Sequence, residues 1–154
     1  MDKIIDKNSF KYVKINSCDF DVQEKIKDDQ ELLRFINANS NETRVIFYKD
    51  VPIGFKCETS YFGVPEFQCA LFKEFRGMGI ANYLLEDFRD RKFKENYRAI
   101  SLLIHKDNEA SIKSARKNGF ILDDTNEELN PVNKEDMYYT FYSFNANYDP
   151  KKRR

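Results

Sequence analysis

The residues best suited to holding a ligand form one short loop, Arg76-Gly77-Met78-Gly79-Ile80-Ala81. The loop follows an apolar run and opens a segment with helical periodicity. Its glycines let the backbone turn sharply and approach a ligand closely. The first N–H groups of a helix lack intrahelical partners and carry partial positive charge, to which Arg76 adds a planar cationic donor. The pattern therefore predicts an anion site that would suit a pyrophosphate.

Two common phosphate-binding fingerprints do not fit this loop. The dinucleotide pattern G-x-G-x-x-G would need a glycine at position 82, where the chain has Asn82. The phosphate loop of nucleotide hydrolases ends in Lys followed by Ser or Thr, and this loop lacks that ending. Taken alone, the loop could also be a glycine-containing turn that binds nothing.

A second pattern lies further along the chain. Asn108 is a favourable N-cap for a helix over residues 109–118. Gly119 suits the left-handed residue that commonly ends a helix. The apolar run at residues 100–104 precedes this helix and predicts a buried strand. A strand and a capped helix are therefore expected after the helix that begins at the loop.

Strands and helices must position these loops, and hydrophobic periodicity predicts where they lie. Strands are expected over residues 10–15, 44–48, 53–61, 67–72, 100–104, 120–122 and 137–145. Helices are expected over 80–93, over 109–118 and over 19–39, the last in two pieces. Turns are expected at 49–52 and at Gly63 with Pro65, and a polar connection at 127–135. This order predicts an α/β fold with a mixed sheet.

Length and charge narrow the class of protein. The 154 residues fit a single domain, expected over 1–147, and the basic tail at 148–154 is expected to be disordered. Lys+Arg 26 and Asp+Glu 26 cancel, which argues against nucleic acid as a partner. Residues 1–10 alternate in charge without a long apolar run, so neither a signal peptide nor a membrane span is expected.

Cysteine and histidine are too few for a metal or disulfide framework. Cys18, Cys57 and Cys69 form no C-x-x-C pair, so free thiols in a reducing compartment are expected. His105 is the one histidine of the chain. A zinc site of the usual Cys/His kind is therefore not expected, and we predict no metal.

The loop and the strand before it match a known signature. Arg76, Gly79 and Ala81 meet the pattern Q/R-x-x-G-x-G/A. The segment 71–77 resembles V-x-P-E-x-R-G, with Lys73 where proline is usual. The later helix meets N-x-x-(A/S) followed by K-x-G-F, at Asn108, Ser111, Lys117, Gly119 and Phe120.

With both motifs at their customary spacing, residues 67–120 resemble the core of the GNAT acyltransferases, while residues 1–40 match only in outline. The resemblance implies a mixed, mostly antiparallel central sheet flanked by helices. In that fold the strands at 67–72 and 100–104 are parallel neighbours that splay apart.

The resemblance also implies the co-substrate, acetyl-CoA, whose pyrophosphate the loop would bind. A backbone N–H of the strand at 67–72, from Leu71 or its neighbour, would polarise the thioester carbonyl. The residues that the resemblance assigns to the cofactor are Leu71, Phe72, Arg76, Gly77, Met78, Gly79, Ile80, Ala81, Asn108 and Ser111.

Direct attack on the thioester requires a neutral amine, so a carboxylate is expected to take its proton. Glu58 and Glu66, on or near the central strands, are the candidates, and each could instead be an ordinary surface glutamate. His105 is a further candidate, because histidine is the usual side chain for proton transfer near neutral pH, with a solvated or structural role as the alternative.

The acid that protonates the leaving thiolate is less clear from the sequence. In the family a tyrosine commonly stands where this chain has Ala115. Ser111 and Ser114 on the helix could donate the proton instead, and Tyr138, Tyr139 and Tyr142 on the last expected strand are further candidates. Alternation places Tyr138 and Tyr142 on one face and Tyr139 on the other, and the sequence leaves the choice of face open.

Three functions fit these motifs. The first is an N-acyltransferase, with acetyl-CoA as donor and a small-molecule or protein amine as acceptor. The second is a non-catalytic acyl-CoA-binding module, which the alanine at position 115 would permit. The third is an interaction scaffold, against which the intact anion loop argues. A monomer or homodimer in the cytoplasm, without membrane contact, is expected.

Overall fold

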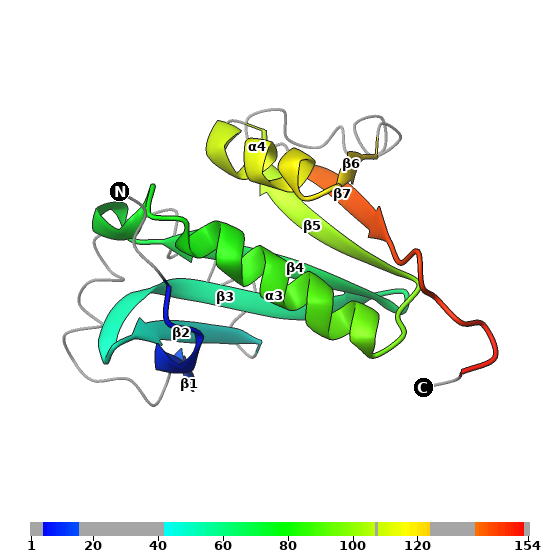
Figure 1. The fold of residues 1–154 in the computed structure, drawn as a ribbon. Coiled ribbons are helices and arrows are strands. Elements are labelled where there is room, and N and C mark those ends of the chain that lie inside the picture. Colours follow the sequence, from blue (N-terminus) through cyan, green and yellow to red (C-terminus); the bar gives the residue numbers. More distant parts are fainter. Residues whose placement is uncertain (1–4, 16–41, 107, 124–137, 153–154) are drawn as a thin grey trace. The chain divides into compact units, whose positions relative to one another are not determined.

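The computed structural model describes residues 5–15, 42–106, 108–123 and 138–152 (Figure 1). The helices predicted over 19–39 and the connection predicted at 127–135 lie outside these ranges. Two helices are described, α3 (Ile80–Lys94) and α4 (Glu109–Lys117). Two short 3-10 helices are described as well, η1 (Lys7–Ser9) and η3 (Lys73–Phe75).

The strands of the described part form one sheet. They are β1 (Phe10–Lys14), β2 (Thr43–Tyr48), β3 (Val51–Tyr61), β4 (Val64–Leu71), β5 (Ala99–His105), β6 (Ile121–Leu122) and β7 (Tyr138–Phe144). Their hydrogen-bonded order is β1-β2-β3-β4-β5-β7-β6. The pairings β1–β2, β2–β3, β5–β7 and β6–β7 are antiparallel, and β4–β5 is parallel. The predicted α/β class with a mixed, mostly antiparallel sheet is thus confirmed.

Two turns are shorter in the structure than predicted from the sequence. The first consists of Lys49 and Asp50, whose φ angles of 50° and 66° suit a tight hairpin, so Val51 and Pro52 belong to β3. The second consists of Phe62 and Gly63, and Pro65 belongs to β4. Proline marked the region of each turn correctly, but in both places it lies inside the strand that follows.

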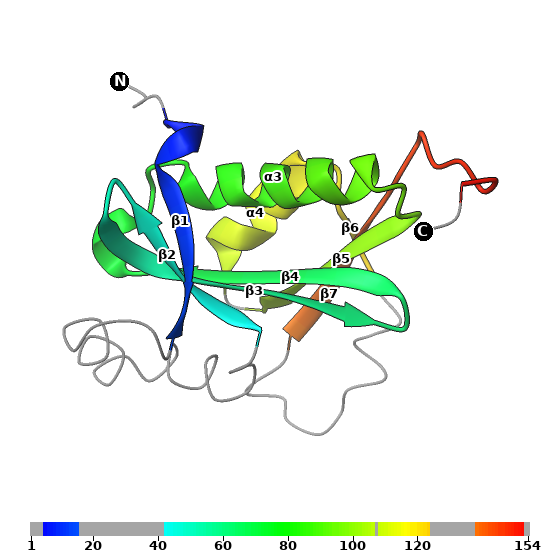
Figure 2. The ribbon, with the colours of Figure 1, turned by 90° about the horizontal axis from the view of Figure 1, so that it is seen from below.

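The described chain divides into two compact units. The first comprises Met1–Glu58 and Cys69–Ala81. Within it β1 pairs with β2 and β2 with β3 (Figure 2). Its core contains Val45, Phe55 and Phe72, and the rings of the two phenylalanines meet edge to face at 5.6 Å. Ala70 and Phe75 also pack against this cluster, so the end of β4 and the turn before the predicted anion loop are part of the apolar core of this unit.

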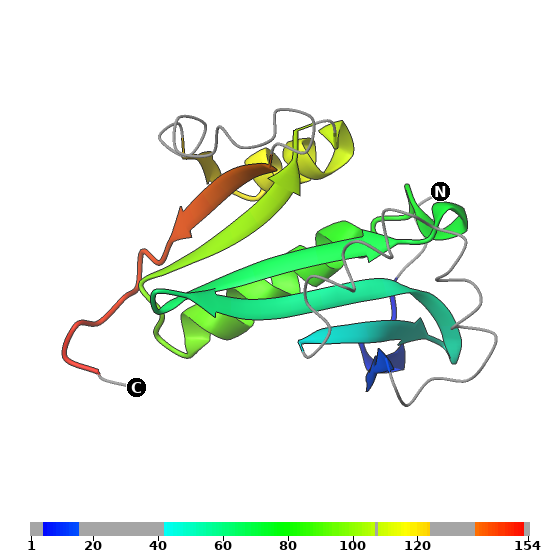
Figure 3. The same ribbon diagram turned by 180° about the vertical axis from the view of Figure 1, so that it is seen from behind.

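The second unit comprises Thr59–Gln68 and Asn82–Arg154. Here Phe67 of β4 stacks on Phe88 of α3, with ring centroids 5.0 Å apart. The guanidinium of Arg116 in α4 lies over the ring of Phe141 in β7. Viewed from behind, β5 and β7 lie in front of α4 (Figure 3). Both helices therefore pack on the sheet face that carries Phe67 and Phe141.

The capping predicted for α4 is confirmed. Asn108 accepts a hydrogen bond from the Ser111 N–H at 3.2 Å, and Gly119 has φ +84°. The N–H of Phe120 donates to the Ala115 carbonyl, and that of Gly119 to the Arg116 carbonyl. This pair of bonds closes the helix as a Schellman motif. The K-x-G-F part of the signature thus has a structural role at the end of this helix.

The C-terminal segment up to Lys152 is attached to the end of α3. The side-chain amide of Asn96 donates to the carbonyls of Asp149 and Lys152 and accepts from the Asp149 N–H. The amide of Asn145 donates to the carbonyls of Phe93 and Tyr97. In the part of the chain that the structure describes, no helix is both long and apolar enough to cross a membrane.

Candidate functional site

The predicted anion loop has the backbone that its glycines permit. Gly77 and Gly79 have φ values of +76° and +81°, in the left-handed region that disfavours other residues. A Cβ at Gly77 would have open space around it, so the glycine is required by conformation and not by crowding. Ile80 opens α3 and is buried, while Met78 is exposed. The loop thus leads directly into a helix whose first N–H groups have no intrahelical acceptor.

Arg76 is held at both its backbone and its side chain. Its N–H donates to the Lys73 carbonyl at 3.2 Å, and its Nε donates to the Leu71 carbonyl at 2.9 Å. The two terminal guanidinium nitrogens have no protein partner among the described residues. One edge of the guanidinium is therefore bound to the protein, and the other edge can take a ligand.

The end of β4 presents one backbone edge that β3 does not use. The Phe72 N–H donates to the Ile53 carbonyl on β3 at 2.9 Å. Successive residues of a strand direct their N–H and C=O groups to alternate sides. The N–H and C=O of Leu71 therefore face away from β3. This distinguishes Leu71 from its neighbour Phe72, whose N–H is already bound.

Gly54 on β3 allows this strand end to pack closely. A Cβ at Gly54 would lie 2.7 Å from the Leu71 Cα and closer still to the Ala70 carbonyl oxygen. Real Cβ atoms do not approach backbone so closely, so a larger residue would push the strands apart. The sequence alone did not identify this requirement, although an isolated glycine within a strand is the usual signal of a close backbone approach.

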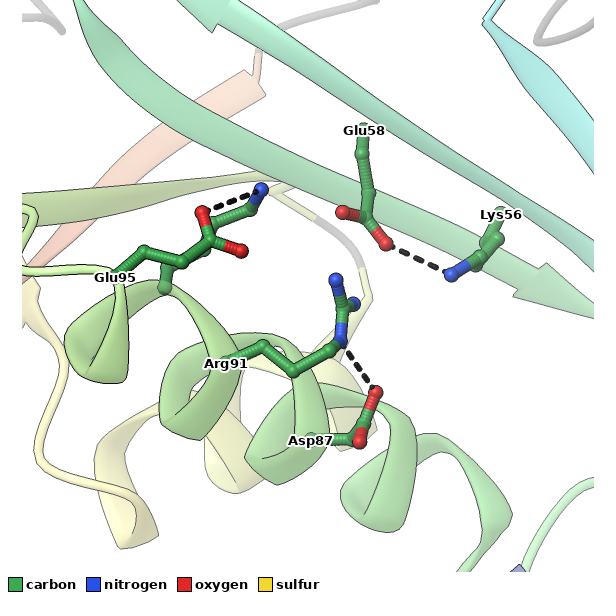
Figure 4. A network of polar contacts seen from close by, with 6 residues as sticks. Lys56, Glu58, Asp87, Arg91 and Glu95 are labelled. Carbon is green, nitrogen blue, oxygen red and sulfur yellow. Dashed lines mark hydrogen bonds and ion pairs between the residues drawn. The ribbon is translucent and has the colours of Figure 1, made fainter. Parts of the chain in front are cut away.

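Glu58, one of the two candidate bases, is engaged by a lysine on its own strand. Its carboxylate lies 2.7 Å from the Nζ of Lys56, and both side chains are largely buried (Figure 4). The Lys56 ammonium also lies 3.8 Å from the centroid of the Tyr12 ring. These three residues, with Glu42 and Arg44, line an open cavity of about 360 Å³. Figure 4 also shows the ion pair of Arg91 and Asp87 along α3.

Cys69 is a further group on the end of β4. Its thiol is a free one, and burial raises its pKa to about 12, against a smaller opposing effect from the positive charge of Lys56. A thiol with such a pKa stays protonated at neutral pH and is a poor nucleophile. Cys57 is free as well and is buried, whereas residue 69 as a whole is partly exposed. Both cysteines of the described part are therefore free thiols, as expected.

Glu66, the other candidate base, has a different environment. It pairs in register with Ser101 of β5, and the parallel ladder consists of this pair and Phe67 with Leu102. The Ser101 hydroxyl lies 3.4 Å from the Glu66 carboxylate and 3.5 Å from the Pro65 carbonyl. Burial raises the pKa of Glu66, and the Ser101 hydrogen bond partly opposes that shift. A ladder this short is what a splayed strand pair predicts.

The face of the sheet that carries Glu66 is opposite to the one that α3 covers. Because Phe67 stacks on α3, its neighbour Glu66 has its side chain on the other face. Ser101 and Tyr142 occupy the same row of register partners and share that face. Tyr139 is three rows away on the opposite face, where its ring meets that of Phe141. The register therefore places Glu66 on the sheet face of Tyr142, opposite to that of Tyr139.

His105 and Tyr138 are paired at one end of the β5–β7 ladder. Alternation from Ser101 assigns position 105 to the face of Glu66, and its register partner, position 138, to the same face. The side chain of Tyr138 lies outside the described part of the structure. Its predicted role as an acid therefore stays a prediction.

Ser114, the other candidate acid, is part of a polar cluster between the two helices. Its hydroxyl donates to the Asn82 side-chain carbonyl at 3.0 Å, and the Asn118 amide donates to the same oxygen at 2.7 Å. Asn82 in turn donates to Glu86 along α3. Ala115, at the position of the family tyrosine, is fully buried. The Ser114 proton therefore already has a protein acceptor.

Sequence reasoning overlooked Ser101 and Asn82. Ser101 is a polar residue inside the apolar run 100–104, and a buried hydroxyl in such a run requires a partner. That partner is across the strand pair, so only the register of β4 with β5 reveals it. Asn82 was considered only as the residue that breaks a glycine pattern, whereas it is the shared acceptor of the helix–helix cluster.

Three solved structures, one from a plant and two from bacteria, illustrate the similarity of fold. Naa50 of Arabidopsis thaliana, in complex with the bisubstrate analogue CoA-Ac-MVNAL, is 19% identical with a TM-score of 0.57, over 88% of this chain and 98% of that chain. N-acetyltransferase PseH of Campylobacter jejuni, in complex with acetyl coenzyme A, is 17% identical with a TM-score of 0.58, over 88% and 98%. An acetyltransferase of Agrobacterium tumefaciens str. C58 is 14% identical with a TM-score of 0.63, over 87% and 90%. At identities this low, the structural similarity shows a common fold alone.

Sequence comparison identifies the family. A comparison with curated protein sequences gives no significant match. The model of the acetyltransferase (GNAT) family matches residues 10–120, which is more than two thirds of the chain. That range runs from the first residue of β1 to the end of the K-x-G-F element and includes the whole anion loop. The predicted fold and enzyme class are confirmed together, and the chain belongs to the GNAT family of acetyltransferases.

Proposed function

We propose that this protein transfers an acetyl group from acetyl-CoA to a primary amine by direct attack of the amine on the thioester. The pyrophosphate would bind at the loop 76–81, which consists of Arg76, two glycines in the left-handed conformation and the start of α3. Acetyl-CoA as donor is supported by the solved relatives whose complexes contain it or an analogue.

The thioester carbonyl would be polarised by the backbone N–H of Leu71. Negative charge develops on the carbonyl oxygen as the amine adds, and a fixed N–H donor stabilises that charge. The Leu71 N–H is directed away from β3, whereas the neighbouring Phe72 N–H is bound to Ile53. A backbone donor also explains why this part of the site has no conspicuous side-chain signature.

Glu66 would accept the proton of the attacking amine. The observation that carries the proposal is its half-buried carboxylate beside the buried Ser101, on the strand that leads into the anion loop. Burial raises the pKa of Glu66, which makes it a stronger base than an ordinary glutamate. Glu58 is a poorer candidate because the ammonium of Lys56 at 2.7 Å favours its charged form and occupies its carboxylate.

The reaction forms the new C–N bond and breaks the C–S bond. The amine proton goes to Glu66, and the coenzyme leaves as a thiolate. A thiolate of pKa about 8.5 leaves readily without a dedicated acid. Among the candidate acids for the thiolate, those at positions 138 and 142 of β7 are on the sheet face of Glu66. Ser114 is a weaker candidate because its hydroxyl is bound to Asn82.

The alternative function is an acyl-CoA-binding module without turnover. One observation favours it: the family tyrosine is replaced by Ala115, which is fully buried in α4. Both functions require the anion loop, so coenzyme binding alone does not separate them. Turnover with an amine does.

The acceptor is proposed only as a class, a small-molecule or a protein amine. The solved relatives suggest the first compounds for a panel. One was solved with the analogue CoA-Ac-MVNAL, and another is a ribosomal-protein-S5-alanine acetyltransferase from Vibrio fischeri. A panel should therefore contain peptides with free N-termini beside polyamines, aminoglycosides and lysine. We propose a monomer or homodimer in the cytoplasm.

The test is coenzyme release from acetyl-CoA, measured with each amine for the wild type and for two matched variants. Glu66→Gln should lower kcat by about 10²–10⁴-fold, the usual contribution of a general base. Glu58→Gln should lower it by less than about threefold. Equal losses in both variants would remove Glu66 from the role of base, and no turnover with any amine, despite binding, would favour the non-catalytic alternative.

A further inference from the structure

Arg76 does more in this structure than supply charge to the anion loop. Its Nε donates to the Leu71 carbonyl at 2.9 Å, five residues back along the chain. A charged donor at this distance forms a strong hydrogen bond. The bond ties the loop to the last residue of β4, which is the residue whose N–H is proposed to polarise the thioester.

The peptide group that joins Leu71 to Phe72 is held from both sides. Its carbonyl oxygen accepts from the Nε of Arg76, and its N–H donates to the carbonyl of Ile53 at 2.9 Å. Two opposed hydrogen bonds fix the plane of a peptide, because rotating it would break both. The Leu71 side chain is buried and close to Gly54, which limits the remaining freedom at its Cα. The Leu71 N–H belongs to the preceding peptide, Ala70–Leu71, so these bonds constrain its direction through the Leu71 Cα, at which the two peptides join.

The same guanidinium has two terminal nitrogens without a protein partner among the described residues. Arg76 follows the 3-10 turn of residues 73–75, and its own N–H closes that turn on the Lys73 carbonyl. One side chain thus has a bound edge toward Leu71 and an available edge at the glycine loop. A planar guanidinium can serve both because its donors are fixed relative to one another.

We propose that Arg76 is a positioning residue for the acetyl-transfer step: by holding the Leu71 carbonyl, it keeps residue 71 in the backbone conformation in which its own N–H polarises the thioester. The proposal rests on the function proposed above, since it presumes that the Leu71 N–H receives the thioester carbonyl. It adds that binding of the pyrophosphate and polarisation of the thioester depend on different nitrogens of one residue, so that substitution can separate them.

Two substitutions make that separation. Arg76→Lys keeps the positive charge but has no donor at the position of Nε. Arg76→Gln keeps an N–H donor at the position equivalent to Nε, because the two side chains have the same number of atoms up to that nitrogen, but it loses the charge and the terminal nitrogens. If Arg76 were only a phosphate ligand, both variants would act through coenzyme affinity, with Arg76→Gln the worse.

The experiment measures the infrared carbonyl stretch of acetyl-CoA labelled with carbon-13 at the carbonyl, free and bound to each variant. It also measures the Kd of CoA and the KM and kcat of turnover. A hydrogen bond to the thioester carbonyl lowers the stretching frequency. Arg98→Lys is the control, because Arg98 is exposed and the described structure gives its side chain no interaction.

In Arg76→Lys we expect the Kd of CoA to rise less than about threefold and the carbonyl stretch to move back toward that of free acetyl-CoA. We expect kcat to fall about 10- to 100-fold, because a small misplacement of a group that acts on the thioester lowers the rate by about this factor. In Arg76→Gln we expect weaker CoA binding with a stretch close to that of the wild type. This pattern, with Arg98→Lys unchanged, supports the proposal.

An unshifted stretch and an unchanged kcat in Arg76→Lys would overturn the positioning role and leave the proposed function intact. A wild-type stretch equal to that of free acetyl-CoA would instead contradict the polarisation by Leu71, and the positioning role with it. Should Arg76→Lys unfold, as judged by circular dichroism, Arg76→Gln alone decides: loss of the carbonyl shift at saturating acetyl-CoA overturns the proposal, and its retention supports it.

Discussion

The anion loop at residues 76–81 and the carboxylate face around Glu66 bear on the same proposed reaction but are encoded differently. The loop depends on backbone conformation: two glycines at positive φ, the start of a helix and one arginine, all within six residues. The face around Glu66 depends on environment: burial, a register partner on another strand and the side of the sheet on which each residue lies.

This difference indicates which residues of the proposed site should tolerate substitution. A loop specified by local conformation tolerates little change at its glycines, since each alternative residue is strained there. A carboxylate specified by its surroundings can be matched by other carboxylates in other places, as Glu58 illustrates with its lysine partner. Substitutions should therefore have large effects in the loop and graded ones around Glu66.

The largest effect on coenzyme binding is expected from Gly79→Glu. The variant introduces a side chain at φ +81° and a negative charge where a pyrophosphate is proposed to bind. Calorimetric titration with CoA should show binding at least about a hundredfold weaker than that of the wild type. Gly63→Glu is the matched control, with the same charge change at φ +80° in the β3–β4 turn. Equal affinities in the two variants would break the assignment of the loop.

The next effect concerns the pH dependence of Glu66. Glu66 must be ionised to act as a base, and burial raises its pKa above the ordinary value of 4.5. The pH profile of kcat/KM should therefore have a rising limb, centred above pH 4.5. Glu66→Gln should abolish the limb together with most of the activity. A limb that survives in this variant would belong to another group, with His105 the first to examine.

Gly54→Ala should affect stability through the strand that carries Leu71. The added methyl group would meet the backbone of Ala70 and Leu71, and overpacking of this kind costs about 1–3 kcal/mol. Urea unfolding followed by circular dichroism would measure the loss. An unchanged midpoint would mean that β3 and β4 separate easily at this point, and that the Leu71 peptide is less rigidly held than we infer.

Ser101→Ala should shift the acid limb without abolishing it. The Ser101 hydrogen bond lowers the pKa of Glu66, so its removal should raise that pKa further and move the limb to higher pH. Within the pH range of the limb, kcat/KM of the variant should be about two- to fivefold lower than that of the wild type. At higher pH the two values should become equal. Ser143→Ala is the control, another buried strand serine but on the opposite face. A shift in both variants would point to a general effect on the sheet.

The smallest effect on catalysis is expected from Ser114→Ala. Its hydroxyl donates to Asn82, so the loss should appear in stability, at about 1 kcal/mol, and not in kcat. A denaturation curve and a steady-state rate measured on the same preparation would compare the two. A tenfold fall in kcat with unchanged stability would restore Ser114 as a candidate acid.

The sequence was most informative where structure is local. The loop, the helix caps at Asn108 and Gly119 and the periodicity of α3 follow from neighbouring residues, and the structure agrees with each. It was least informative where partners are distant. The proximity of Ser101 to Glu66, the shared face of Tyr142 and the close approach at Gly54 all depend on strand register, and a shift of one residue would reverse the face of every side chain.

The most direct test of acetyl transfer is titration of the purified protein with acetyl-CoA, run beside coenzyme release on the amine panel. We predict binding between about 1 μM and 1 mM, the usual range for enzyme substrates, and release of coenzyme with at least one amine. Absence of binding by acetyl-CoA, CoA and longer acyl-CoAs would contradict the account, because the loop 76–81 would then be only a turn.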